Sequence, residues 1–151
     1  MPELIICDTS CLILYDKINQ LDLLRLCYSS IYVTPEVASE YGKQLPDWIL
    51  IRKVANQSYQ TILEQILGVG ESSAIALGLE VPESVVVIDD LKARKVAKSL
   101  NLQTTGSLGI LVKAKHKGHV DRLTPLLEQL QQTDFRISEK ILAKILSLVG
   151  E

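Results

Sequence analysis

Acidic side chains recur in this chain at the ends of short apolar runs and near the starts of expected helices. They are Asp8, Glu36 with Glu40, Glu71, and Asp89 with Asp90. Converging carboxylates repel one another, so they persist together only when they are protonated or when a cation lies among them. Carboxylate oxygens with open positions for water suit Mg²⁺ or Mn²⁺. Such a site can activate a water molecule and stabilise an in-line displacement at a phosphodiester.

Helix ends offer a second explanation for several of these acids. Asp8 is able to cap the helix that begins near Ser10, because a short acidic side chain accepts hydrogen bonds from free backbone N–H groups. Glu36 and Glu71 fall in first turns, where the helix dipole favours an anion. These structural roles and the metal-binding role both remain open at this point.

Glu40 and the Asp89–Asp90 pair are harder to explain by helix ends alone. Glu40 lies four residues after Glu36, and like charges at that spacing cost about 0.2–0.5 kcal/mol on a helix surface. An ion pair with Lys43 is the structural alternative for Glu40. One of the two adjacent aspartates can cap the following helix, but a single cap does not require both.

Short apolar segments alternate with segments of helical spacing along the chain. Strands are expected at 4–7, 31–33, 85–88 and 102–104, with an edge or irregular strand within 48–54; helices are expected at about 10–17, 21–26, 35–42, 58–67, 71–79, 91–100, 107–117, 121–132 and 138–149. This alternation predicts a three-layer α/β/α fold with a central, mostly parallel sheet of four to five strands. Ligands bind at the carboxyl ends of such strands, so we expect the acids to gather there.

The composition limits the classes of protein to consider. The 151 residues are 47% hydrophobic with a net charge of −2, which excludes a disordered chain and a strongly basic nucleic-acid coat. No linker divides the chain, so residues 1–151 are expected to form a single domain. The three cysteines lack metal-site or disulfide spacing. The start lacks the basic region of a signal peptide, and no apolar run is long enough to span a membrane. We therefore expect a soluble, cytoplasmic protein.

Four segments together resemble the PIN domain, the small α/β fold of metal-dependent nucleases. They are Ile5-Ile6-Cys7-Asp8-Thr9-Ser10, Val33-Thr34-Pro35-Glu36-Val37-Ala38-Ser39-Glu40, Gly70-Glu71-Ser72-Ser73-Ala74-Ile75-Ala76-Leu77 and Val87-Ile88-Asp89-Asp90-Leu91-Lys92-Ala93-Arg94. The Asp-Asp-x-x-Ala-Arg and Thr-Gly-Ser-Leu-Gly-Ile-Leu pieces look closest to an uncharacterised prokaryotic branch, related to the toxin ribonucleases of type II toxin–antitoxin systems.

The resemblance implies a PIN-like fold and a Mg²⁺- or Mn²⁺-dependent endoribonuclease, with a toxin role as one form of that activity. It assigns catalytic metal-ligand roles to Asp8, Glu40, Glu71 and Asp90, with Asp89 as a further candidate ligand. Thr9 or Ser10 would orient Asp8 or a metal-bound water. An RNA substrate, an antitoxin protein and a homodimer are the implied partners.

Two features of the chain depart from the pattern of the related toxins. Ile88 stands where those toxins commonly have threonine, and the basic charge of the chain is modest. These two features support an alternative, a non-catalytic PIN-like module that binds RNA or a protein and keeps a degenerate metal site.

Basic residues gather in the expected helix near residue 115 and beyond it. Lys113, Lys115 and Lys117 are candidate contacts for RNA phosphates, and a solvated helix end is the alternative. Arg94 could pair with Asp90 or hold a phosphate. The apolar positions of the last helix, about 137–149, indicate core packing or a face for a dimer or an antitoxin.

Overall fold

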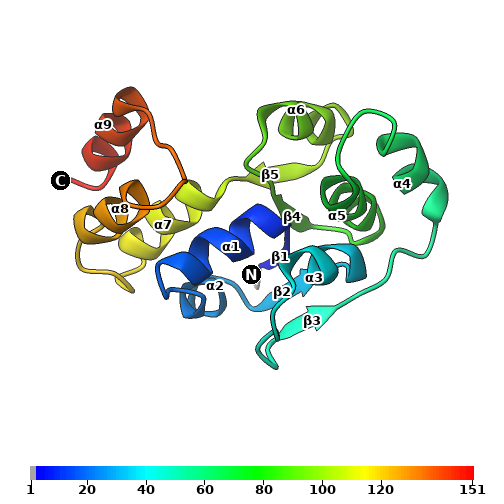
Figure 1. The fold of residues 1–151 in the computed structure, drawn as a ribbon, viewed down its shortest axis with the longest axis horizontal. Helices are drawn as coiled ribbons and strands as arrows, with labels where there is room; N and C mark the ends of the chain where they lie inside the picture. The colour runs from blue at the N-terminus through cyan, green and yellow to red at the C-terminus, as the bar shows by residue number, and fades with distance from the viewer. Residues whose placement is uncertain (1–2) are drawn as a thin grey trace.

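The computed structural model describes residues 3–151 and has a five-stranded sheet at its centre (Figure 1). The strands are β1 (Leu4–Cys7), β2 (Ser30–Val33), β3 (Ile49–Ile51), β4 (Ser84–Val87) and β5 (Gln103–Thr105). Their order across the sheet is β3-β2-β1-β4-β5, and every neighbouring pair is parallel. The expected α/β class and parallel sheet are therefore confirmed.

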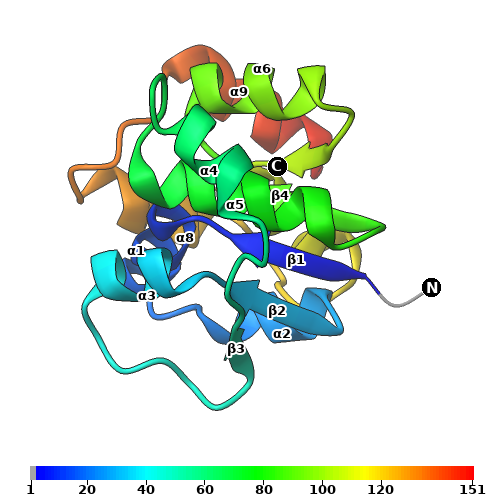
Figure 2. The same ribbon diagram turned by 90° about the vertical axis from the view of Figure 1, so that its right-hand side faces the viewer.

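Helices connect the strands and cover the sheet. They are α1 (Thr9–Lys17), α2 (Asp22–Cys27), α3 (Pro35–Tyr41), α4 (Gln57–Leu63), α5 (Val69–Glu80), α6 (Leu91–Ser99), α7 (Ser107–His116), α8 (Thr124–Gln131) and α9 (Glu139–Leu148). In Figure 2, α4 and α5 lie above β1, and β1, β2 and β3 follow one below another. A parallel sheet needs cover on both faces because its strands are apolar on both sides.

Alternating strand residues divide the buried apolar side chains into two clusters. On β1, Ile5 and Cys7 belong to the cluster formed with α1, α2, α7, α8 and α9, whereas Ile6 belongs to the cluster formed with α5 and α6. Successive side chains of a strand point to opposite faces. The three-layer α/β/α arrangement follows from this alternation.

The last helices pack into the first of these clusters rather than standing apart from it. Leu127 and Leu130 of α8 and Ile145 of α9 are buried there with residues of α1 and α7. Within residues 3–151, no helix combines the length and the apolar character that a membrane crossing would require.

Element boundaries differ from the sequence expectations by a few residues. α5 begins at Val69 rather than at Glu71, because Gly68 takes the extended backbone of a helix-capping position. The 48–54 segment forms only the three-residue edge strand β3, beside β2. β5 is shifted by one residue, to Gln103–Thr105.

The direction in which successive strands are added to the sheet reverses next to β1. The chain passes from β1 to β2 and β3 on one side, then returns to place β4 and β5 on the other. Cys7 at the end of β1 is in register with Val87 at the end of β4. Such a reversal leaves a crevice beyond the carboxyl ends of the two strands.

Candidate active site

Asp8 lies directly beyond β1, at the carboxyl edge of the sheet. Its backbone N–H donates to Val87 O at 3.2 Å, which extends the β1–β4 pairing by one residue. Its carboxylate Oδ1 accepts from Thr9 N at 2.7 Å, so Asp8 also caps α1. The side chain is only 5% exposed. The capping role and a role in a site therefore coexist in this residue.

Burial raises the pKa of Asp8 to about 7. The Thr9 N–H opposes this shift, and the negative charges of Glu71, Glu40 and Asp89 add to it. Because Asp8 is buried, little water screens it from these neighbouring charges. The carboxylates predicted from distant segments are thus near enough to Asp8 to disfavour its ionised form.

Glu40 joins the group from the last turn of α3. Its Oε1 accepts a hydrogen bond from Thr9 Oγ1 at 2.6 Å. A Cβ on Gly70 would lie 2.1 Å from that oxygen and 3.2 Å from Thr9 Oγ1. A side chain at this position would displace the Glu40 carboxylate, so glycine lets α5 begin close to α1 and α3 with Glu40 in place. Lys43 pairs with Asp16 instead, so the structural alternative for Glu40 is wrong.

Glu71 stands in the first turn of α5 and is half-buried. Its Oε1 accepts from Gly68 N at 3.2 Å, which supports the helix start. Burial raises the pKa of Glu71, the Gly68 N–H lowers it, and the charges of Asp90 and Glu40 raise it further. Glu71 therefore links the acids near α1 and α3 with those that follow β4.

The two adjacent aspartates after β4 have different surroundings. Asp90 Oδ2 accepts from Ala93 N at 2.9 Å and caps α6. Asp89 Oδ1 accepts from Ser107 N at 2.7 Å, and its Oδ2 accepts from the hydroxyls of Ser107 and Ser10 at 2.6 and 3.2 Å. Asp89 thereby joins the starts of α1 and α7. Ser10 supports Asp89 rather than Asp8, and Thr9 holds both Asp8 and Glu40.

The donor chemistry of this group fits a hard divalent cation. Carboxylates supply oxygen ligands, and a cation would relieve the repulsion that raises the pKa of Asp8. Within residues 3–151, however, no three His, Cys, Asp or Glu side chains already surround one metal position. Mg²⁺ is commonly held by one or two carboxylates, with water and phosphate oxygens as its other ligands. Asp8 and Glu71 would be the carboxylates to hold it.

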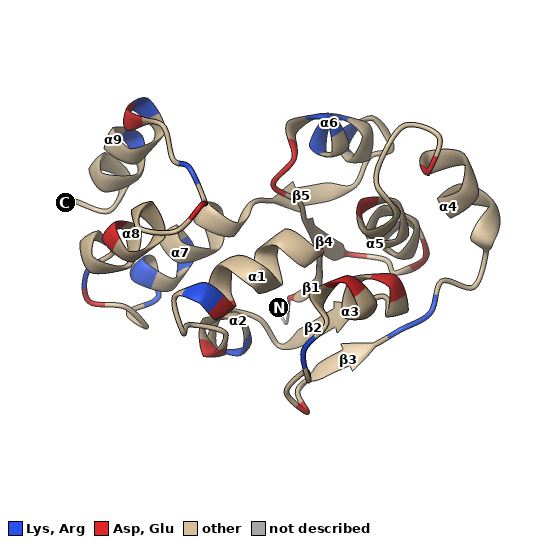
Figure 3. Cartoon of the chain, in the orientation of Figure 1, with Lys and Arg blue, Asp and Glu red and all other residues tan. Residues whose placement is uncertain are grey.

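Figure 3 shows the acidic positions of α3, α5 and the segment leading into α6 around the middle of the molecule. Basic positions lie on α6, α7 and α9, at the end of α1, on α2 and in the segment that follows β3. The electrostatic pattern is therefore an acidic centre with basic residues around it.

Arg94 does not pair with Asp90. Its guanidinium Nη2 and Nε donate to Ile88 O at 2.7 and 3.2 Å, and its Nη2 would lie 2.5 Å from a Cβ at Gly106. A planar guanidinium suits this two-pronged contact with one carbonyl. Arg94 thus fixes the backbone between β4 and Asp89.

The lysines of α7 are not brought to the acidic group. Lys113 pairs with Glu3 at 2.6 Å and lies over the Tyr28 ring, and Lys117 Nζ donates to Cys27 O at 3.0 Å. Lys115 donates to Asp121 O. α7 begins at Ser107 beside Asp89, and about ten residues at 1.5 Å rise separate that end from Lys117. These lysines hold local structure. Because α7 follows β5, its first residues lie at the carboxyl edge beside the acids and its lysines lie towards its other end.

Sequence reasoning missed several residues that support the site. The Thr34 hydroxyl lies 2.6 Å from Ser73 Oγ, which donates to Gly70 O at 2.8 Å, so this buried chain of contacts ties α3 to the start of α5. Ser107 and Gly70 were likewise not singled out. A small residue directly after a strand or at a helix start was the signal available for them.

A model of the PIN-domain family matches residues 4–151. The chain therefore belongs to the PIN-domain family, and the resemblance carried by its four segments is confirmed. PIN domains are generally nucleases that depend on divalent metal ions. No curated protein and no solved structure matches the chain.

Proposed function

We propose that this protein is an endoribonuclease that hydrolyses RNA phosphodiesters with the help of Mg²⁺ or Mn²⁺. The observation that carries the proposal is the buried carboxylate of Asp8, whose pKa of about 7 reflects burial and the charges of Glu71, Glu40 and Asp89. An unpaired group of this kind costs stability. A divalent ion is the ligand that would make the arrangement favourable, and the family assignment supports this interpretation.

The residues of the site have separate tasks in this proposal. Asp8 and Glu71 hold the ion, which when bound polarises a phosphate oxygen and makes a water molecule more acidic. Thr9 orients both Asp8 and Glu40 through its N–H and its hydroxyl. Glu40 and Asp90 lie close enough to Glu71 to influence its charge, and we assign them to binding the same ion or its water molecules.

The decisive test is RNA cleavage by the purified protein with Mn²⁺ or Mg²⁺, with EDTA, and by the Asp8→Asn variant. We expect Asp8→Asn to lower the cleavage rate by more than about 100-fold, because even groups that only support a metal ligand contribute about 10–100-fold. Asp22→Asn is the matched control, since Asp22 is exposed on α2 and its ion-pair partner among residues 3–151 is Arg25 alone. Metal-dependent cleavage that persists in Asp8→Asn would remove Asp8 from the mechanism.

A second candidate function is a module that binds RNA or a protein without cleaving it. It is favoured by one observation, that no three potential ligands among residues 3–151 already surround a metal position. Calorimetric titration with Mn²⁺ distinguishes the two functions. Binding that Asp8→Asn abolishes supports the nuclease, whereas no binding together with no cleavage supports the module. The toxin role, the antitoxin partner and the homodimer stay predictions from the family resemblance.

A further inference from the structure

A groove of about 570 Å³ begins beside Asp89 and separates α6 and β5 from α9. Its floor comes from the end of β5 and from α7, including Thr105, Leu108 and Val112. Figure 1 shows α6 and α9 on the same side of the molecule, with α7 and β5 beneath them. Asp89 lines the groove and also accepts a hydrogen bond from Ser10 Oγ, two residues after Asp8, so the groove begins at the edge of the acidic group.

The two walls of the groove combine apolar and basic side chains. One face of α6 contributes Leu91, Arg94 and Lys98, which lie three and four residues apart and so share one side of the helix. α9 and the segment before it contribute Phe135, Arg136, Ile137, Ile141, Lys144, Ile145 and Leu148. Leu91, Ile141 and Leu148 are 70%, 48% and 55% exposed, so the apolar surface is open to a ligand.

The cations of the groove lack acidic partners. Neither Lys98 nor Lys144 forms an ion pair within residues 3–151, and Arg136 donates only to Thr133 O. The single acid in the lining, Asp89, already accepts three hydrogen bonds. The groove is therefore locally positive in a protein whose net charge is −2, and it is complementary to a polyanion.

We propose that this groove binds a single-stranded segment of the nucleic acid whose scissile phosphate lies at the acidic group. The inference rests on the proposed nuclease function and adds where the strand runs and in what form. Lys98, Lys144 and Arg136 contact successive phosphates, and the unpaired bases lie on the apolar floor. Proteins that bind single strands combine a positive groove with aromatic side chains on which bases stack, and Phe135 is the aromatic side chain in this lining.

A duplex is a poorer match to the same lining. Its bases are paired and stacked inside, so it presents mainly phosphates and sugars to a protein. Those groups would have to lie against Leu108, Val112 and Ile141 without hydrogen-bond partners, which carries a desolvation cost. The combination of open apolar floor and unpaired cations thus selects an unpaired strand.

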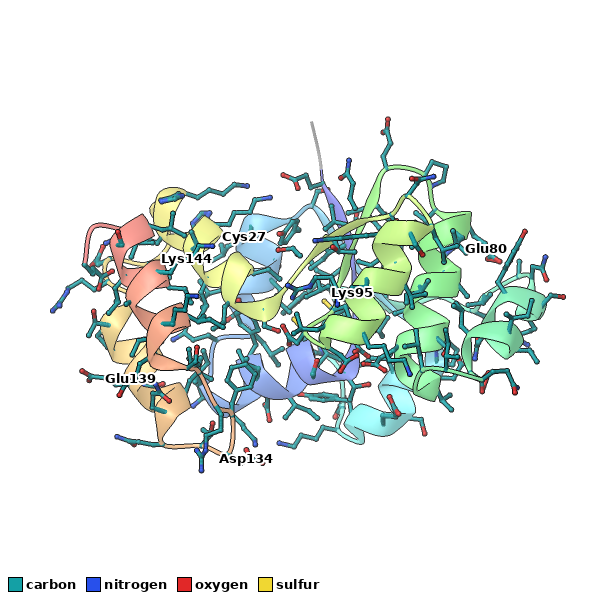
Figure 4. All side chains as sticks on the ribbon, turned by 90° about the horizontal axis from the view of Figure 1, so that it is seen from above. Cys27, Glu80, Lys95, Asp134, Glu139 and Lys144 are labelled. Atoms are coloured by element: carbon teal, nitrogen blue, oxygen red, sulfur yellow. The ribbon has the colours of Figure 1, made fainter. Side chains whose placement is uncertain are left out.

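Binding and cleavage are measured separately in the test. A short unstructured RNA carrying a fluorophore, and the same strand in a duplex, are titrated in Ca²⁺ at several salt concentrations. The groove variant is Lys98→Gln with Lys144→Gln. The matched control is Lys95→Gln with Lys140→Gln, which removes the same charge from the same two helices at positions outside the groove. Figure 4 labels Lys144 on α9 and Lys95 on α6, with α7 between these helices.

The groove variant is expected to bind the single strand more weakly than the control variant does. The slope of log affinity against log salt should become shallower by about 1.4, since each lost phosphate contact on a single strand removes ~0.7. Ile141→Gln tests the apolar part of the α9 wall. It should weaken single-strand binding several-fold, whereas Leu26→Gln, at a similarly exposed position on α2, should not.

Equal losses in the groove and control variants, or equal affinity for duplex and single strand, would overturn the proposal. The apolar lining would then indicate a protein segment with acidic flanks as the occupant. Metal-dependent cleavage that persists without groove binding would refute this inference and leave the proposed function intact. Groove-dependent single-strand binding without any cleavage would refute the proposed function and leave the groove as a binding site for a single strand.

Discussion

Asp8 combines two properties that a side chain seldom has together, near-complete burial and several acidic neighbours. It is 5% exposed, and its pKa of about 7 has burial as the largest cause. Among residues 3–151, the donor to its carboxylate is Thr9 N alone. Perturbed acids of this kind concentrate at functional sites because reactivity and metal binding require them. The resulting loss of folding stability in the metal-free protein is measurable.

We expect the stability of the metal-free protein to fall as pH rises from about 4 to about 7. Between the ordinary pKa of 3.8 and the raised value near 7, the folded state holds a proton on Asp8 that the unfolded state has lost. The free energy of unfolding then decreases by at most about 1.4 kcal/mol per pH unit and levels off above pH 7. Urea denaturation in EDTA across this pH range measures the free energy of unfolding.

Asp8→Asn should flatten this part of the profile, because asparagine does not titrate. Asp22→Asn, at an exposed position on α2, should keep the wild-type slope. An unchanged pH dependence in Asp8→Asn would show that Asp8 is not the group responsible.

At the scale of elements, the site is a meeting point of helix ends. The starts of α1, α5, α6 and α7 and the end of α3 all lie at the carboxyl edge of the sheet, where their side chains meet through short contacts. Helix starts carry free N–H groups and a positive dipole end. These groups stabilise the carboxylates that a site of this kind requires, even before an ion binds.

Gly70→Ala tests how closely α5 must approach α1 and α3. The added methyl group would lie 2.1 Å from Glu40 Oε1, so this carboxylate has to turn away and lose its hydrogen bond to Thr9. We expect metal-dependent cleavage to fall by about 10–100-fold. The free energy of unfolding should change by less than about 1 kcal/mol, because only the end of a flexible side chain moves and alanine favours a helix.

Gly68→Ala is the control for this substitution. Its added methyl group would approach only Glu71 Oε1, at 3.4 Å, which is an ordinary contact. Full activity in Gly70→Ala would mean that the position of Glu40 does not matter for the reaction.

At the scale of the whole molecule, the C-terminal helices are held by apolar packing and by a set of hydrogen bonds that Glu151 accepts from Leu123 and Thr124, here called the clasp. Glu151 accepts from Leu123 N at 2.8 Å and from the N–H and hydroxyl of Thr124 at 3.0 and 2.6 Å. This contact ties the end of α9 to the start of α8. It thereby helps to hold α9 in place as one wall of the groove.

The Thr124 hydroxyl, the main cause, lowers the pKa of Glu151 to about 2, together with the Leu123 N–H. The clasp therefore contributes fully above the ordinary pKa of 4.5 and is lost as pH falls towards 2. We expect Glu151→Gln to speed hydrogen exchange of α9 amides at neutral pH, and Glu128→Gln, exposed on α8, to leave it unchanged. Equal exchange in both variants would contradict the clasp.

The alternation of apolar strands and helices was enough to predict the fold, because strand burial and helix capping depend on residues that are close together in the sequence. The same pattern placed Asp8, Asp89 and Asp90 after strands, and parallel strands bring their ends to one edge. Helix boundaries such as the start of α5 were less certain, since a glycine cap leaves no side-chain signal.

The sequence by itself predicted that carboxylates would gather at the carboxyl edge of the sheet, but it did not show that Glu36 would bind Gln60 instead. Only the tertiary structure decided their separate tasks, because their partners come from distant segments: Ser10 and Asp89 are 79 positions apart, and Thr9 and Glu40 are 31 positions apart. It also turned the lysines of α7 away from the acids and placed Lys98 and Lys144 along one groove. Neighbours in sequence fix a helix or a strand, but the direction of a side chain depends on which remote element packs against it.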